Sequence, residues 1–149
     1  MFMPIRADDP SITGDMLLYR RIPPYDGSVG WADETPTFSS KNFADKIHEL
    51  SFNIAAETTP ERVLAGNEGF GIIQVTVEEI RAACTNQLTG KCDIVICRDD
   101  ENSADGHVLV CGEIRPNMRK RIQKACRWVD GQWPSRELQP ERPTAPAPD

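Results

Sequence analysis

Residues 70–84 read FGIIQVTVEEIRAAC and carry the strongest fold signal in the chain. The first six of these residues are dense in apolar side chains and predict a central β-strand. Thr76 and Glu79 follow at the spacing of a capping box, in which each side chain bonds the other residue's free backbone amide and so starts a helix. The apolar residues of that helix share one face: Val77, Ile80 and Cys84. A strand that leads directly into an amphipathic helix indicates helices packed on a sheet.

Further strands and helices are predicted on both sides of this unit. Apolar runs predict strands at residues 16–22, 50–55, 92–98 and 107–114. Helices are expected after Ser39 or Ser40, after Thr59, and from Pro116 to residue 129, because capping residues and prolines mark their starts. Residues 23–36, rich in Gly, Pro and Asp, are expected to form a loop. This order predicts the α+β class, with one mixed sheet of about five strands covered by three to four helices.

The length of 149 residues suits a single domain. We expect a weakly ordered N-terminal segment at 1–15, an α+β domain at 16–130 and a proline-rich disordered tail at 131–149. No apolar run reaches the roughly 20 residues of a membrane span, and the start does not resemble a signal peptide. Five cysteines in mostly apolar surroundings favour reduced thiols, and so a cytoplasmic protein without membrane contact.

Charge is distributed unevenly along the chain. Residues 115–129 hold six cations and no acid: Arg115, Arg119, Lys120, Arg121, Lys124 and Arg127. The whole chain has 17 Lys and Arg and 23 Asp and Glu, so the other residues carry 11 bases and all 23 acids. A local charge of +6 therefore lies on a body with a net charge of −12. Such a segregated basic surface is typical of a surface that faces a partner.

This basic segment supplies the candidate site. We expect a binding or accessory module rather than an enzyme, with no cofactor and with these partner-binding residues: Arg115, Arg119, Lys120, Lys124 and Arg127. The expected partner is an acidic protein surface or a second copy of the chain. Nucleic acid is the weaker alternative, because the whole chain has a net charge of −6 and Trp128 is the one aromatic residue near these cations.

Two other sets of side chains suggest metal binding or acid–base chemistry. Soft ligands of the kind zinc takes occur within one stretch of the chain: Cys92, Cys97, His107 and Cys111. Residues five apart on a strand face opposite sides, so Cys92 and Cys97 do not converge and no metal is expected. An acidic loop precedes His107 and contains Asp99, Asp100, Glu101 and Asp105. A carboxylate there could orient the imidazole as a general base, although a histidine at a turn with no catalytic role is the simpler interpretation.

A last set is Arg20 or Arg21, Ser39-Ser40 and Glu113. Their order resembles the arginine, serine and glutamate order of ADP-ribosyltransferase-like folds. The resemblance implies that Arg20 would hold a nicotinamide dinucleotide and that Glu113 would stabilise a ribosyl cation. It rests on three positions, and Ser39 fits a helix cap equally well. An NAD-utilising enzyme with Arg20, Ser39 and Glu113 is therefore the alternative to a binding module.

Overall fold

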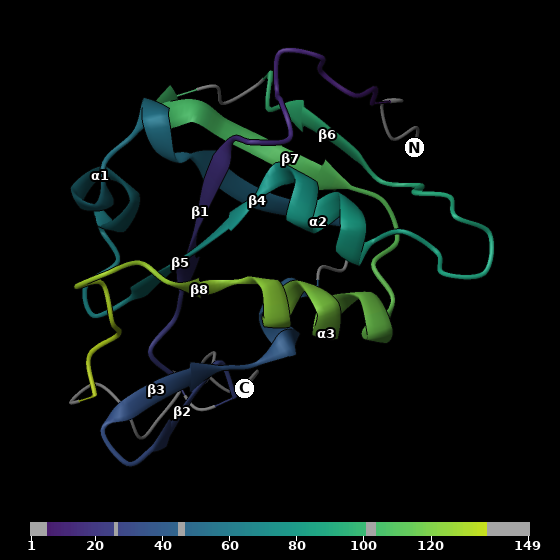
Figure 1. Cartoon of the computed structure of the whole chain (residues 1–149). Helices are drawn as coiled ribbons and strands as arrows, with labels where there is room; N and C mark the ends of the chain where they lie inside the picture. The colour runs from purple at the N-terminus through teal and green to yellow at the C-terminus, as the bar shows by residue number, and fades with distance from the viewer. Residues whose placement is uncertain (1–5, 26, 45–46, 101–103, 137–149) are drawn as a thin grey trace, which may run out of the picture.

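The computed structural model describes residues 6–25, 27–44, 47–100 and 104–136. Within these ranges, a six-stranded sheet, a separate two-stranded hairpin and three α-helices form one α+β domain (Figure 1). The predicted α+β class is confirmed. The outer parts of the two predicted tails, residues 1–5 and 137–149, lie outside the described residues. No helix in the described part of the chain is long and apolar enough to cross a membrane.

The six strands of the main sheet lie in the order β6-β7-β4-β1-β5-β8. Their bounds, in the same order, are Val95–Arg98, His107–Cys111, Glu49–Ile54, Leu17–Ile22, Gly71–Thr76 and Arg127–Trp128. Every neighbouring pair of strands is antiparallel, so the prediction of a mixed sheet is wrong. β6 and β7 are joined by the polar loop after residue 98, as predicted for a long hairpin.

Two of the helices cover one face of this sheet. α2 (Val77–Ala83) follows β5 directly, and Thr76 and Glu79 form the predicted capping box. α3 (Pro116–Ala125) lies beside α2 in front of the sheet in Figure 1. The core lies between these helices and the sheet, and its fully buried members include Leu18, Phe52, Ile73, Ile80 and Ile122. The short α1 (Pro60–Leu64) packs separately beside β1.

The predicted loop at 23–36 is wrong for its second half. β2 (Val29–Ala32) and β3 (Thr35–Phe38) form a hairpin there. Its turn has Asp33 at φ 59°, a left-handed conformation that Asp tolerates better than most residues. The predicted helix after Ser39 is a single turn, η1 (Ser40–Phe43), because β4 begins at Glu49. Ser39 caps this turn as expected.

The last predicted helix is too long at its C-terminal end. α3 stops at Ala125, and Arg127 and Trp128 pair with β5 as β8. The Trp128 ring explains the change, because its Nε1 donates to Pro36 O at 2.9 Å and its ring meets Phe38 edge-on at 5.2 Å. These contacts require an extended backbone that places Trp128 on the core side of the sheet.

Residues 6–15, for which the sequence predicts weak order, contact the sheet at β6. Asp9 N donates to Ile96 O at 3.0 Å, and Ile96 N donates to Asp8 Oδ1 at 2.8 Å. Ile12 is buried in the core. The division of the chain at residues 15 and 130 stays a prediction.

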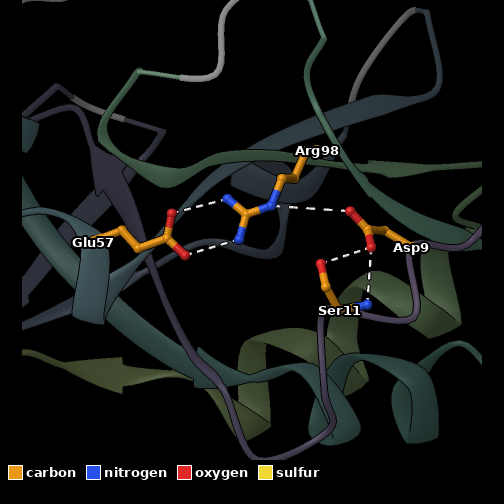
Figure 2. Close-up of polar contacts among 4 residues, drawn as sticks. All are labelled: Asp9, Ser11, Glu57 and Arg98. Atoms are coloured by element: carbon orange, nitrogen blue, oxygen red, sulfur yellow. Dashed lines mark hydrogen bonds and ion pairs between the residues drawn. The ribbon is translucent and has the colours of Figure 1, made fainter.

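The guanidinium group of Arg98 contacts both this N-terminal segment and the segment after β4 (Figure 2). Arg98, the last residue of β6, donates from Nη1 and Nη2 to the two carboxylate oxygens of Glu57, at 2.8 and 2.9 Å. Its Nε lies 3.9 Å from Asp9 Oδ2. Asp9 Oδ1 in turn accepts hydrogen bonds from the backbone and hydroxyl of Ser11. Glu57 lies in η2 (Ala55–Glu57), so Arg98 joins the end of β6 to the segment after β4.

Candidate functional sites

The sheet is split between its two central strands. β1 and β4 pair at only two positions, the last of which is Tyr19 opposite Asn53. β1 nevertheless stays paired with β5 along its whole length, and β4 stays paired with β7 over residues 49–53. The two halves of the sheet therefore separate beyond Tyr19, and the space between them is open to other side chains.

Arg20 bridges this split. Its Nη1 donates to Ser51 O at 2.7 Å, while Nε and Nη2 donate to Asn42 O at 3.2 and 2.7 Å. The guanidinium carbon lies 5.4 Å from the ring centroid of Phe52 and 6.0 Å from that of Phe43. All three nitrogen atoms are thus held by backbone carbonyls, and the side chain ties η1 to β1 and β4 while it keeps its positive charge.

A cavity of about 730 Å³ lies at the split. Its walls come from β1, β4, η1, α1, the loop after β1 and the turn before β7. The polar side chains that line it include Arg21, Lys41, Ser51, Asn53, Arg62 and His107. This volume lies in the range of small-molecule sites in proteins.

The described residues that line the cavity carry a net positive charge, although the chain is acidic. Its described lining residues carry four cations and one acid: Arg20, Arg21, Lys41, Arg62 and Asp105. The Asp105 carboxylate pairs with Arg62 Nη1 at 3.1 Å, in a contact that is largely open to solvent. Arg21 Nη1 donates to Val63 O at 3.2 Å. Within the described part of the chain, no acid pairs with Arg21 or Lys41.

His107 stands at the rim of this cavity with a carboxylate behind it. Its Nδ1 lies 3.0 Å from Asp99 Oδ2, and the two side chains are 17% and 16% exposed. Because the carboxylate accepts from Nδ1–H, Nε2 is the ring nitrogen left for another partner. Asp99 belongs to the acidic loop considered above, so the hypothesis of an imidazole oriented by a carboxylate agrees with this geometry.

The basic segment forms a second candidate surface, which is smaller than the sequence suggested. Arg115, Lys120 and Lys124 are exposed on or next to α3. Arg119 donates to Ile114 O at 3.2 Å, and the neighbouring Arg121 donates to Ala83 O at 2.9 Å, so both are partly used inside the fold.

Arg127 lies apart from this surface. It belongs to β8 and pairs with Gln74, whereas the adjacent pair of Ile73 and Trp128 faces the core and α3. Neighbouring residues of a strand point to opposite faces, so the Arg127 side chain is directed away from α3. The sequence predicts Arg127 in the same helix as Lys120, but Arg127 lies outside α3 because the helix ends two residues earlier.

The three positions that resemble an ADP-ribosyltransferase site do not come together. Arg20 lines the cavity, and Ser39 caps η1 outside the lining. Glu113 is exposed beyond Cys111, at the opposite end of β7 from His107, and does not line the cavity. The separation arises because β4 lies between β7 and β1 in the sheet, so the residues after the end of β7 are kept apart from Arg20.

The cysteines show no metal arrangement. Among the described residues, no three His, Cys, Asp or Glu side chains gather as a metal site. Cys97 and Cys111 lie on neighbouring strands, while the segment at Cys92 pairs with Thr85. Burial, followed by the nearby Cys97 thiol, raises the pKa of Cys111 to about 12.

Sequence patterns did not reveal four polar residues that line the cavity: Lys41, Ser51, Asn53 and Arg62. One signal was available in β4, where Glu49, Ser51 and Asn53 alternate with buried residues, as in a strand with one polar face. Lys41 and Arg62 come from short helical turns, and no local pattern indicates that these turns meet at the split.

Comparisons of the chain with protein-family models, with curated proteins and with solved structures find no match.

Proposed function

We propose that this chain is a binding module that engages an acidic protein surface through the α3 surface, defined by Arg115, Arg119, Lys120 and Lys124. One observation carries the proposal: within the described residues, none of the six cations between 115 and 127 forms an ion pair. Of the other described cations, Arg6, Arg62, Arg81 and Arg98 are paired with acids, whereas Arg21, Lys41 and Lys91 are not. A concentrated charge left without internal partners is complementary to an acidic surface and speeds its association.

Further observations bear on the extent of the proposed surface, the location of the protein and the identity of its partner. Arg127 is directed to the opposite face, so the proposed surface excludes it. The five cysteines are free thiols, which agrees with the cytoplasmic location that we retain in the proposal. A second copy of the chain is one acidic partner to be tested, because the residues outside 115–129 carry a net charge of −12.

The test uses a fluorescently labelled glutamate peptide of about fifteen residues as an acidic probe, and fluorescence anisotropy at low and high salt. Lys120→Glu and Lys124→Glu should each weaken binding about threefold or more at low salt, and the effect should shrink as salt is added. Lys91→Glu is the matched control, since Lys91 is also exposed but lies outside α3. All variants should keep the stability of the wild type.

Equal affinity of the Lys120, Lys124 and Lys91 variants for the peptide would overturn the α3 surface as the binding site. Sedimentation of the wild type at low salt shows whether the chain associates with itself. Self-association that is lost in the Lys120→Glu, Lys124→Glu double variant identifies the partner as a second copy, whereas a monomer at every salt concentration leaves a different acidic protein.

A further inference from the structure

We propose that the cavity at the split binds a small organic phosphate, a ligand site separate from the α3 surface. The proposal does not depend on a protein partner. It rests on three features of the described residues: a concave space of suitable size, an excess of cations, and an apolar wall beside them.

The cations identify the charged end of the ligand. Arg21 and Lys41 have no acidic partner among the described residues, and Arg62 shares the solvent-exposed Asp105. Arginine presents a planar set of donors that fits phosphate oxygens two at a time, and lysine adds a compact positive charge. Arg20 adds positive charge beside them, although backbone carbonyls already hold three of its five N–H groups. Together they favour a group with several negative oxygens.

The size and the apolar residues identify the other end. A cavity of about 730 Å³ is too large for a phosphate ion alone and holds a molecule of sugar-phosphate or nucleotide size. Pro23, Val63 and Phe70 line it. Tyr25 fixes the Phe70 ring in an edge-to-face contact at 6.1 Å. An organic group on the phosphate would lie against this wall.

Neutral hydrogen-bonding groups lie between the two ends. Ser51 offers a hydroxyl in the cavity. Asn53 donates through Nδ2 to Asp105 O at 3.1 Å, so its amide is held in a fixed orientation. His107, fixed by Asp99 through Nδ1, adds Nε2. Hydroxyl and imidazole groups of this kind recognise the hydroxyls of a sugar or the oxygens of a phosphate.

Isothermal titration calorimetry with three probes tests the proposal: ribose 5-phosphate, inorganic phosphate and citrate. The wild type should bind ribose 5-phosphate more tightly than inorganic phosphate, and citrate more weakly than either. The double variant Arg21→Gln, Arg62→Gln should lose about tenfold or more in affinity for ribose 5-phosphate. Arg81→Gln with Lys91→Gln removes two cations outside the cavity and should bind like the wild type.

The substitution Phe70→Ala tests the apolar end of the site separately from the phosphate-binding end. The substitution should weaken the affinity for ribose 5-phosphate severalfold and leave the affinity for inorganic phosphate unchanged. Circular dichroism of each variant confirms that it is folded. The proposal is overturned if neither phosphate binds at concentrations on the order of 10 mM, if citrate binds best, or if both double variants bind equally well. Binding of inorganic phosphate with no preference for ribose 5-phosphate would overturn the claim that the ligand carries an organic group.

Discussion

Arg20 Nη1 donates a 2.7 Å hydrogen bond to Ser51 O across the split between β1 and β4. This contact and the two bonds to Asn42 O occupy the place where the strands no longer pair. The guanidinium therefore joins β1, β4 and η1 where the backbones have separated. It is also one of the residues that line the cavity.

Replacement of Arg20 by Lys should destabilise the domain by about 1.5–3 kcal/mol, because an ammonium cannot reach Ser51 and Asn42 together and loses the planar contact with Phe52. Urea denaturation measures the change. Arg21→Lys is the control, since Arg21 has one described hydrogen bond, to Val63 O. Equal unfolding midpoints for the two variants would contradict the bridging role of Arg20.

Glu57 should make the stability of the fold depend on pH in the acidic range. Hydrogen bonds from Arg98 lower the pKa of the Glu57 carboxyl below its ordinary value, which is about 4.3. A carboxyl with a lowered pKa in the folded state stabilises the fold above the unfolded pKa, and this contribution is lost as pH falls through the folded pKa. The wild type should therefore lose more stability between about pH 5 and pH 3 than Glu57→Gln does.

The two side chains are 32% and 39% exposed, so solvent screens the pair and its contribution at neutral pH should stay below about 1 kcal/mol. Glu61→Gln is the matched control, because Glu61 is exposed on α1 and has no ion pair among the described residues. Chemical denaturation at several pH values supplies the measurement. Parallel pH profiles for the wild type and Glu57→Gln would show that Arg98 does not hold this carboxylate in solution.

Much of the fold could be predicted from local patterns. The strand and helix around Thr76 follow directly from apolar density and a capping box, and the start of α3 follows from Pro116. The errors at β3 and β8 lie on the two sides of one contact. Trp128 packs with Phe38 and Pro36, which lie about ninety residues earlier, and at β8 this contact overrides the helical pattern.

The cavity is harder to predict than the fold. It depends on where β1 and β4 stop pairing, which is a property of strand order and not of any local segment. The sequence pointed to the basic segment because six cations without acids are visible in one line. The cations of the cavity are spread over more than forty residues and come together only in the folded chain.

Gly71→Ala should destabilise the domain by about 1–3 kcal/mol. A Cβ at this position would lie 2.8 Å from Pro134 Cδ and 2.8 Å from Trp128 Cζ3, so the segment after β8 would have to move. Urea denaturation gives the stability, and tryptophan emission reports the surroundings of Trp128. An unchanged midpoint would show that Pro134 does not pack against β5 as described.

The thiols of Cys84 and Cys126 should resist alkylation in the folded protein. Burial, above all other causes, raises the pKa of each thiol to about 12. The reactive thiolate is therefore scarce at pH values near 8, and it increases only as pH approaches the raised pKa. Iodoacetamide labelling followed by peptide mass spectrometry should find both residues unmodified until urea is added. Labelling of Cys84 at the rate of the unfolded chain would contradict its burial.

The contacts of Asp8 and Asp9 with Ile96 have a consequence for association between copies of the chain. β6 is an edge strand, and a bare edge offers its amides and carbonyls to any other extended segment. Here the amide of Ile96 is taken by the Asp8 carboxylate, and its carbonyl is taken by the backbone of Asp9. The opposite edge, β8, is only two residues long. Both borders of the sheet are thus poor templates for strand addition, which protects the protein from edge-to-edge aggregation.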